Sequence, residues 1–488
     1  MNHPHRLIPG RARTGIALAA ISLLAACGGS DGPAAVPEET RLQDSRTFTA
    51  DATATTFTAM AAAAGDVIDM STTSRWAGVL GGAGYHVEVP KNWNGKLVMY
   101  AHGYAGTGAA VGVSDPAIRR YLVQNGYAWA ASSYSKNYYD VRAGVEDTNA
   151  LALEFTNIAA KNSRPLAAPT KIYITGVSMG GHITAAAIED ETQATAIHKV
   201  KYNGAVPMCG VVGDTELFNE FAAMQVTAQA LAGLPNYPTD KWADINTLVT
   251  STLFTTFPSV PTAKGAKYLS VLKNITGGDR PMFDLGIAFG GVFGYAWGVF
   301  GSDGTVSGLL NKNVLDTNAY TYTIAGDVAG STALNATVLK LTAATDANRL
   351  RTDGLRWIPK VNGEFKIPVV SIHTLGDLYV PFSMEQTYQK RVAAKGNSAW
   401  LVQRAIRGVS HCDFTVAEQA TAFDDMVKWE GGGAKPGGDD VMTAATVAAP
   451  TYGCTYTNNK LGADDSPSFV GALRAATLGI PAAVCPAS

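Results

Sequence analysis

The fold of this 488-residue chain is decided by residues 171–187, which read KIYITGVSMGGHITAAA. The first five residues form an apolar, β-branched run typical of a buried strand, and the last seven predict a helix. Between them lies a G-x-S-x-G sequence with Ser178 at its centre. A strand-to-helix turn of this kind is tight, and Gly176 and Gly180 remove the side chains that would clash in it. The stretch predicts that Ser178 is exposed at the edge of a sheet, at a helix N-terminus whose dipole favours negative charge.

The residues on both sides of this stretch alternate between strand-like and helix-like segments. Short β-branched or aromatic runs predict strands, and longer segments with helical composition predict helices. The expected strands are residues 85–89, 96–100, 127–131, 171–174, 367–372 and 400–402, and the expected helices are residues 115–124, 145–161, 181–187, 384–394 and 415–429. Strands that alternate with helices in this way form a mostly parallel sheet with helices on both faces. The predicted fold class is therefore α/β.

Residues 210–365 interrupt this alternation. They include residues 286–300, where glycines are interleaved with five aromatic side chains. A transmembrane helix needs about 20 apolar residues, and here aspartates and glycines break up the apolar run. We expect this region to form a cap or lid over the active edge of the sheet. It would be inserted between two parts of one core, residues 66–209 and residues 366–488.

The N-terminal segment has the pattern of an export signal. Three arginines in the first 13 residues provide a basic start, and residues 15–26 form an apolar run as long as a signal-peptide core. The Leu-Ala-Ala-Cys sequence that ends at Cys27 resembles the lipobox of bacterial lipoproteins, in which the cysteine is lipid-modified after cleavage. An ordinary secretory signal is the alternative, and both predict an exported protein. We assign residues 1–27 to the signal and residues 28–65, rich in Gly, Pro, Ala and Thr, to a flexible tether from the membrane anchor.

The composition excludes two broad classes of protein. Hydrophobic residues make up 47% of the chain and charged residues 16%, so the chain can bury a large core and is not intrinsically disordered. The formal net charge is -2, whereas a protein that binds nucleic acid mainly through phosphates needs a strong basic excess. We therefore expect a globular, glycine-rich, catalytic protein that does not bind nucleic acid.

The order of these motifs resembles the α/β-hydrolase superfamily over residues 76–430, outside the insertion. The resemblance implies that the serine of the G-x-S-x-G sequence is a nucleophile and that an oxyanion loop follows an earlier strand. The sequence Tyr-Ala-His-Gly-Tyr at residues 100–104 occupies that place. The family pattern implies an oxyanion hole formed by the backbone N–H groups of Tyr104 and Met179, with the side chain of His102 in a structural role.

The same resemblance implies that a carboxylate and then a histidine follow the nucleophile along the chain. Asp377 lies in the sequence Gly-Asp-Leu-Tyr-Val-Pro after a predicted strand, which matches the pattern of the orienting acid. Asp214, which follows the strand near Val206, is the alternative acid. His411 lies in a glycine-containing loop after the last predicted strand and is the predicted base. Other histidines after the nucleophile fit that position less well, and they are His182, His198 and His373.

Four cysteines remain once Cys27 is assigned to lipidation, and they are Cys209, Cys412, Cys454 and Cys485. In an oxidising compartment four thiols can pair in three ways, between which the sequence does not choose. We favour Cys209 with Cys412, which would tie two loops on the catalytic side, and Cys454 with Cys485, which would staple the C-terminal tail. No C-x-x-C or H-E-x-x-H spacing indicates a zinc site, and the implied chemistry needs no metal or organic cofactor.

The placement of Cys412 directly after His411 resembles a motif of secreted tannases and feruloyl esterases. In those proteins a cysteine after the catalytic histidine is disulfide-bonded to a cysteine beside the nucleophile. Here the residue before Ser178 is Val177, so half of that motif is present. The resemblance implies a brace on the histidine loop, with the partner cysteine coming from another strand end.

These resemblances imply a secreted serine hydrolase with Ser178, Asp377 and His411 as its catalytic residues. Ser178 attacks an acyl carbon, His411 takes its proton, and Asp377 holds the imidazolium. We expect carboxylic esters as substrates, including aromatic esters and polyesters, because the insertion is rich in aromatic residues. Two alternatives belong to other classes. One is a serine peptidase that resembles prolyl oligopeptidases, although no propeller repeats are visible; the other is an inactive hydrolase fold used for binding, which would not need all three residues.

Overall fold

The computed structural model describes residues 38–289, 293–466, 472, 474 and 485. The predicted signal segment with Cys27, and residues 28–37 of the predicted tether, lie outside the described residues. Within the described ranges, none of the helices combines the length and the apolar character that a membrane span requires.

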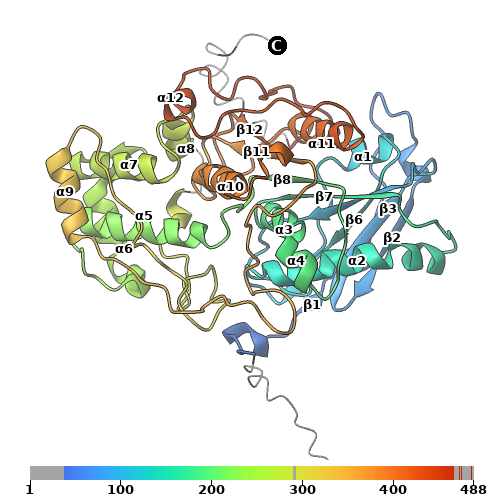
Figure 1. Cartoon of the computed structure of the whole chain (residues 1–488), viewed down its shortest axis with the longest axis horizontal. Helices are drawn as coiled ribbons and strands as arrows, with labels where there is room; N and C mark the ends of the chain where they lie inside the picture. The colour runs from blue at the N-terminus through green and yellow to red at the C-terminus, as the bar shows by residue number, and fades with distance from the viewer. Residues whose placement is uncertain (1–37, 290–292, 467–471, 473, 475–484, 486–488) are drawn as a thin grey trace, which may run out of the picture. The chain divides into compact units, whose positions relative to one another are not determined.

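An eight-stranded sheet forms the centre of the fold (Figure 1). Its strands are β2 (Ser74–Leu80), β3 (Ala83–Val89), β4 (Lys96–Ala101), β6 (Ala128–Ser132), β7 (Lys171–Val177), β8 (Gly204–Met208), β11 (Val369–Thr374) and β12 (Leu401–Ile406). The strand order is β12-β11-β8-β7-β4-β6-β3-β2. Neighbours from β12 to β6 are parallel, and β3 is antiparallel to both β6 and β2. The predicted α/β class is confirmed.

Helices cover both faces of this sheet. The helices that pack on it are α1 (Arg119–Gln124), α2 (Val141–Lys161), α3 (Met179–Ala187), α10 (Ser383–Ala394) and α11 (Val416–Glu430). Residues of α2, α3 and α10 belong to one hydrophobic cluster, and residues of α1 and α11 belong to a second. Strand β4 separates the two clusters, because Leu97 and Met99 face the first and Val98 and Tyr100 face the second. A strand that is buried on both faces has apolar residues at successive positions, which is why the sequences of the parallel strands do not alternate between apolar and polar residues.

Two predicted helix starts are displaced by four residues for local reasons, and the other helix ends lie within two residues of the prediction. Helix α2 begins at Val141 because the carboxylate of Asp140 accepts a hydrogen bond from the backbone N–H of Ala143, 3.0 Å away, and so caps the first turn. Helix α1 begins only at Arg119, because Asp115 is not part of the helix and its carboxylate instead binds the Arg119 guanidinium at 2.8 Å. The hydrogen bonds of two aspartates, Asp140 and Asp115, therefore account for the difference between the observed and the predicted helix starts.

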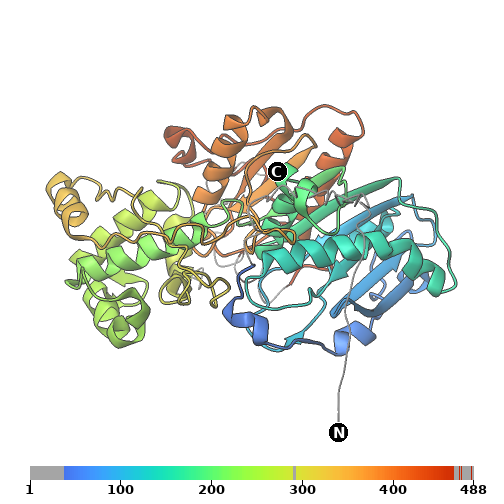
Figure 2. The same cartoon turned by 60° about the horizontal axis from the view of Figure 1, so that its bottom comes forward.

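Residues 210–365, which interrupt the alternation of predicted strands and helices, form a mostly helical region between β8 and β11. Its elements are α5 (Glu216–Ala232), η4 (Thr239–Lys241), α6 (Trp242–Leu253), β9 (Phe254–Thr256), β10 (Val260–Pro261), α7 (Ala263–Ile275), α8 (Phe283–Phe289), η5 (Phe293–Ala296) and α9 (Val328–Thr337). Strands β9 and β10 pair only with each other. In Figures 1 and 2 these helices stand to one side of the sheet, beyond β8, β11 and α10. The region therefore has its own architecture and adds no strand to the central sheet.

The predicted tether is wrong from Glu38 onward, because residues 38–65 belong to the same compact unit as the sheet. Arg41 forms an ion pair with Asp140 at 2.7 Å, and the two side chains are 2% and 1% exposed. The Arg41 guanidinium also lies 3.8 Å from the ring centre of Trp357. The buried ion pair of Arg41 and the pairing of β1 (Thr49–Ala50) with β5 (Ala110–Val111) anchor this segment, although its composition suggested flexibility.

The other short elements of the chain are η1 (Leu42–Ser45), η2 (Ala52–Thr55), η3 (Met70–Thr72), α4 (Asp190–Thr195), η6 (Ser398–Trp400) and α12 (Ala444–Val447).

Replacing Arg41 should destabilise the folded chain. We expect Arg41→Met to lower the free energy of unfolding by about 3 kcal/mol, because it leaves the buried carboxylate of Asp140 without its cation. Arg46→Met is the matched control, since Arg46 is exposed and stacks on Tyr138 at 4.1 Å; it should cost about 0.5–1 kcal/mol. Urea denaturation of the two variants measures both values, and equal losses would contradict the anchoring role of Arg41.

Candidate active site

Ser178 occupies a sharp turn between β7 and α3. Its φ of 58° and ψ of -122° lie outside the helical and extended regions, and its backbone N–H donates to the carbonyl of Met208 at 3.0 Å. A Cβ on Gly176 would lie 2.6 Å from the carbonyl oxygen of Ala101, and a Cβ on Gly180 would collide with the same carbonyl. The glycines are therefore required by the close approach of the turn to the end of β4, as the sequence predicted.

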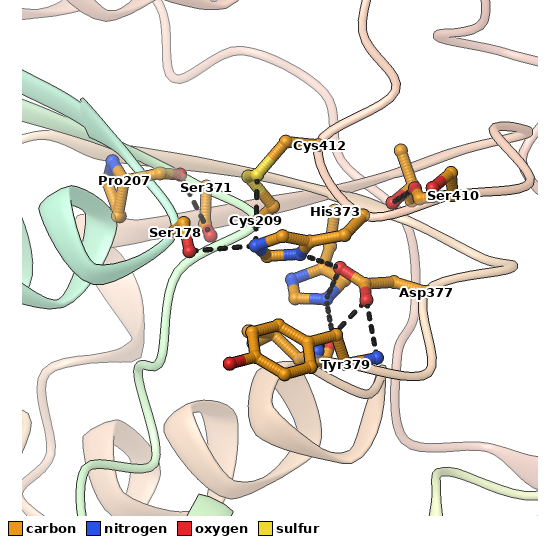
Figure 3. Close-up of a disulfide and its surroundings, with 12 residues drawn as sticks. Ser178, Pro207, Cys209, Ser371, His373, Asp377, Tyr379, Ser410 and Cys412 are labelled. Atoms are coloured by element: carbon orange, nitrogen blue, oxygen red, sulfur yellow. Dashed lines mark hydrogen bonds and ion pairs between the residues drawn. A yellow bond between two sulfur atoms is a disulfide. The ribbon is translucent and has the colours of Figure 1, made fainter. Parts of the chain in front are cut away.

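The structure brings Ser178, His411 and Asp377 together in one line of hydrogen bonds (Figure 3). The Nε2 atom of His411 lies 2.7 Å from Ser178 Oγ, and its Nδ1 atom lies 2.6 Å from Asp377 Oδ2. Because a carboxylate only accepts hydrogen bonds, Nδ1 carries the proton and Nε2 is left to accept from the serine hydroxyl. The three residues follow β7, β11 and β12, so parallel strands deliver all of them to the same edge of the sheet.

Asp377 is held rigidly from behind. Its side chain is fully buried, and its Oδ1 atom accepts hydrogen bonds from the backbone N–H groups of Tyr379 and Val380, each at 2.9 Å. These bonds leave Oδ2 directed at His411. Two backbone donors and a histidine thus satisfy the buried carboxylate and fix the direction of each of its oxygens.

A second histidine, His373, lies behind Asp377, and no sequence pattern predicted a role for it. His373 Nε2 donates to the carbonyl of Val380 at 2.7 Å and lies 3.8 Å from Asp377 Oδ2. Its Nδ1 atom lies 3.4 Å from Glu385, which also accepts a hydrogen bond from Ser371 at 2.6 Å. Burial by itself lowers the pKa of His373, but Glu385, Asp377 and the carbonyl of Val380 together outweigh it, so the pKa is raised. Only the strand-end position of His373 hinted at this network, which ties the Asp377 turn to α10.

The two disulfides pair the cysteines as we favoured, Cys209 with Cys412 and Cys454 with Cys485. Cys209 follows β8, and Cys412 Sγ lies 3.5 Å from Nε2 of His411 (Figure 3). The sulfurs and the imidazole are close enough to hold a metal ion, but both sulfurs are bonded to each other and cannot act as thiolate ligands. The disulfide therefore fastens the loop of His411 to the end of a different strand.

The alternative acid, Asp214, does not face His411. It is fully buried and forms ion pairs with Lys360 at 3.0 Å and with Arg391 at 2.6 Å. Burial by itself raises the pKa of Asp214, but Lys360 and Arg391 outweigh it and hold the pKa well below its usual value. The backbone N–H of Val361 also donates to it at 3.0 Å. Asp214 thus fastens the end of the insertion to α10, and its place after a strand end was a misleading signal.

The remaining histidines near the site have structural partners. His182 is fully buried, with Nε2 donating to the carbonyl of Pro359 at 2.8 Å and Nδ1 accepting from the Tyr139 hydroxyl at 2.9 Å. Burial lowers its pKa to about 4, so it stays neutral. His102 stacks on Tyr134 with ring centres 4.1 Å apart, and its Nδ1 lies 2.6 Å from the carbonyl of Gly103. Neither imidazole reaches the nucleophile.

The two predicted oxyanion donors belong to segments that adjoin Ser178. Met179 is the first residue of α3, where backbone N–H groups have no partner within the helix. Tyr104 follows Gly103, and a Cβ on Gly103 would lie 3.2 Å from Ser178 Cβ, so this loop runs against the nucleophile. Their role in binding an oxyanion stays a prediction.

Aromatic side chains border the nucleophile and come partly from the insertion. Tyr379 packs its ring edge-to-face with His411, with centres 5.5 Å apart, and Phe221 of α5 lies 5.5 Å from Tyr379. On the other side, the hydroxyl of Tyr104 lies 2.9 Å from Oγ of Ser307 in the insertion. The insertion therefore contacts both the acid turn and the predicted oxyanion loop.

The strand order, the turn at Ser178 after β7, and the positions of Asp377 after β11 and His411 after β12 give the chain the α/β-hydrolase fold. No family model matches the chain. A 68-residue stretch is 29% identical to the o-phthalyl amidase of Xanthobacter agilis, and this match spans 14% of the chain and 15% of that protein.

Solved structures similar to this chain include two hydrolases. Feruloyl esterase B from Aspergillus oryzae is 15% identical with a TM-score of 0.40, and the match covers 74% of this chain and 80% of that chain. The acylaminoacyl peptidase of Pyrococcus horikoshii is 11% identical with a TM-score of 0.37, and the match covers 76% of this chain and 42% of that chain.

Removing the disulfide beside His411 should weaken the fold. We expect the double variant Cys209→Ala/Cys412→Ala to lose about 2–4 kcal/mol of unfolding free energy, because the bond restricts the unfolded chain across a separation of 203 residues. Chemical denaturation measures the loss. Cys454→Ala/Cys485→Ala is the matched control, and its smaller separation of 31 residues predicts a smaller loss. Native-like unfolding of the first variant would contradict the bracing role.

The two candidate acids should respond differently to replacement by asparagine. We expect Asp377→Asn to lower kcat by about 10⁴-fold, because the amide cannot hold His411 in the required tautomer. Asp214→Asn should leave kcat near the native value and lower stability by about 3 kcal/mol, since it leaves Lys360 and Arg391 without their carboxylate.

The pH dependence of stability gives a second readout for Asp214. Its pKa is depressed in the folded chain, so its contribution is complete above the unfolded value of about 3.9 and is lost as the pH falls below that value. The stability difference between native protein and Asp214→Asn should therefore narrow in acid. A difference that stays constant down to about pH 2, or a large loss of kcat at neutral pH, would refute this assignment.

Proposed function

We propose that the chain is a serine hydrolase that cleaves carboxylic esters through an acyl-enzyme. The observation that carries the proposal is the continuous hydrogen-bonded line from Ser178 Oγ through His411 to Asp377, at 2.7 and 2.6 Å. The line starts at a strained turn with a positive φ, which directs the serine away from the backbone of its own strand. Nucleophile, base and orienting acid in this arrangement are the parts that covalent acyl transfer requires.

The proposed reaction has two halves. Ser178 Oγ attacks the acyl carbon while His411 Nε2 takes the hydroxyl proton, and Asp377 stabilises the imidazolium that forms. The backbone N–H groups of Tyr104 and Met179 bind the developing oxyanion, a contribution of about 2.7–4 kcal/mol for each donor. His411 then gives its proton to the leaving alcohol, and in the second half it activates water to release the acid from Ser178.

The aromatic surroundings favour esters with an apolar or aromatic group. The half-buried ring of Tyr379 lies edge-to-face beside His411 and is backed by the buried ring of Phe221, and Tyr104 belongs to the loop that runs against Ser178. Burial first of all, with further contributions from Tyr104 and Asp377, raises the pKa of Tyr379 to about 12, so its hydroxyl stays neutral. Neutral aromatic walls bind flat apolar groups better than charged ones.

Amide hydrolysis is the second candidate, because esters and amides share the acyl-enzyme path. The observation in its favour is the 68-residue match to o-phthalyl amidase, which is 29% identical but spans 15% of that protein. An amide needs stronger protonation of the leaving group than an ester does, and His411 is the group placed to provide it. A comparison of matched ester and anilide substrates separates the two.

We further propose that the protein is exported and anchored to a bacterial membrane by a lipid on Cys27, at the periplasmic or cell surface. Two disulfides among the described residues are compatible with an oxidising compartment. An anchored extracellular hydrolase can act on substrates that are too large to import, polyesters among them. Mass spectrometry of the mature N-terminus tests the proposal, because a diacylglyceryl-modified cysteine has a distinctive mass.

Replacing Ser178 should abolish turnover and leave the fold intact. We expect Ser178→Ala to lower kcat by at least about 10⁴-fold with an unchanged melting temperature. The measurements are hydrolysis of nitrophenyl esters of rising chain length, matched nitroanilides and labelling by a fluorophosphonate probe. Ser398→Ala, at an exposed position outside the site, is the control and should behave as native. Equal labelling of native protein and Ser178→Ala would refute the proposal, and faster anilide than ester turnover would favour the amidase.

A further inference from the structure

The loop that carries His411 is held at both ends by one arginine from the C-terminal tail. The Nη2 atom of Arg474 donates to the carbonyl of Asp413 at 2.6 Å, and Nη1 donates to the carbonyl of Arg407 at 3.4 Å. Residues 407–413 form the whole connection from the end of β12 to the segment before α11. A single guanidinium therefore bridges the first and last residues of the loop.

The same guanidinium neutralises two buried carboxylates. Arg474 lies 3.4 Å from Asp413 and 2.9 Å from Glu418, and all three side chains are at most 2% exposed. Asp413 in turn accepts a hydrogen bond from the backbone N–H of Val409 at 3.0 Å, across the loop. The path from Arg474 through Asp413 to Val409 therefore crosses the loop beside His411. Without the cation, two carboxylates would remain close together in a dry environment, which is strongly unfavourable.

The tail is itself tied to the site. Arg474 lies between Cys454 and Cys485, whose disulfide closes this part of the chain. From the loop side, Arg407 Nη1 donates to the carbonyls of Pro450 and Tyr452, each at 2.8 Å. Arg474 therefore donates to carbonyls of the His411 loop, and Arg407 of that loop donates to carbonyls of the chain that follows α11.

We propose that Arg474 is a positioning residue of the active site, because it fixes the loop that presents His411 to Ser178. The disulfide to Cys209 holds the loop next to the imidazole, and Arg474 holds its two ends. A planar guanidinium can serve two carbonyls and two carboxylates at once, which a lysine ammonium cannot do in this geometry. The inference rests on the proposed function, because positioning matters only if His411 acts as the base.

The test compares Arg474→Met and Arg474→Lys with native protein. A displacement of His411 by about 1 Å costs on the order of 10²-fold in rate, so we expect Arg474→Met to lower kcat by about 10–100-fold. Because Arg474 is not in contact with the nucleophile, KM should stay near the native value, and the rate of fluorophosphonate labelling should fall in parallel with kcat. Arg474→Lys keeps the charge and loses one arm, so we expect an intermediate loss.

Arg164→Met is the matched control. Arg164 also donates to two backbone carbonyls, those of Val89 at 2.9 Å and Pro90 at 2.7 Å. These carbonyls lie at the C-terminal end of β3, which is antiparallel to β6 and so ends at the sheet edge opposite to the one that carries His411. Arg164→Met should lose stability and keep native kcat. A folded Arg474→Met variant with native kcat would overturn the proposal. If that variant does not fold, native kcat in Arg474→Lys would overturn it equally.

Failure of the inference can be told apart from failure of the proposed function. Ser178→Ala is measured in the same assays. If Ser178→Ala retains activity, the serine hydrolase itself is refuted. If Ser178→Ala is inactive while the Arg474 variants turn over at the native rate, only the positioning role of Arg474 is refuted.

Discussion

The two hydrogen bonds of the His411 imidazole are the constraint on which the rest of the site depends. Nδ1 must donate to Asp377 so that Nε2 can accept from Ser178, and these partners come from two different strand ends. Hydrogen bonds require donor–acceptor distances within a range of about half an ångström and weaken steeply when the donor–hydrogen–acceptor angle falls below about 120°. Three loops that are far apart in the chain must therefore be placed with side-chain accuracy.

The structure meets this demand by fastening each loop at more than one point. The Ser178 turn is fixed by the close approach of Gly180 to β4, which only a missing side chain permits. The Asp377 turn is held by its own backbone amides and rests on the buried His373. The His411 loop is held by a hydrogen bond from the Val409 N–H to Asp413, by the disulfide to Cys209, and by Arg474. Each of the three loops is therefore fixed by more than one kind of contact.

Much of the fold and the site could be predicted because local patterns carry them. The run before Ser178 had to be a buried strand, and the glycines around it had to form a turn, whatever the remainder of the chain did. The resemblance to α/β-hydrolases implied the order of Ser178, Asp377 and His411, and each of them follows a predicted strand. Residues 38–65 were misjudged because composition does not reveal a single buried ion pair such as that of Arg41. Arg474 carried no local signal at all.

The sequence by itself determined the α/β class and the turn at Ser178, since periodicity and glycine placement are local properties. Its resemblance to α/β-hydrolases implied the candidates for acid and base. Tertiary structure shows that Asp377 binds His411, whereas Asp214, which also follows a strand end, binds Lys360 and Arg391. It also decided the cysteine pairing, the contacts of the insertion with Tyr104, and the bond from Arg474 to a loop remote from it in the chain. These choices depend on distances between segments far apart in sequence, which no local pattern encodes.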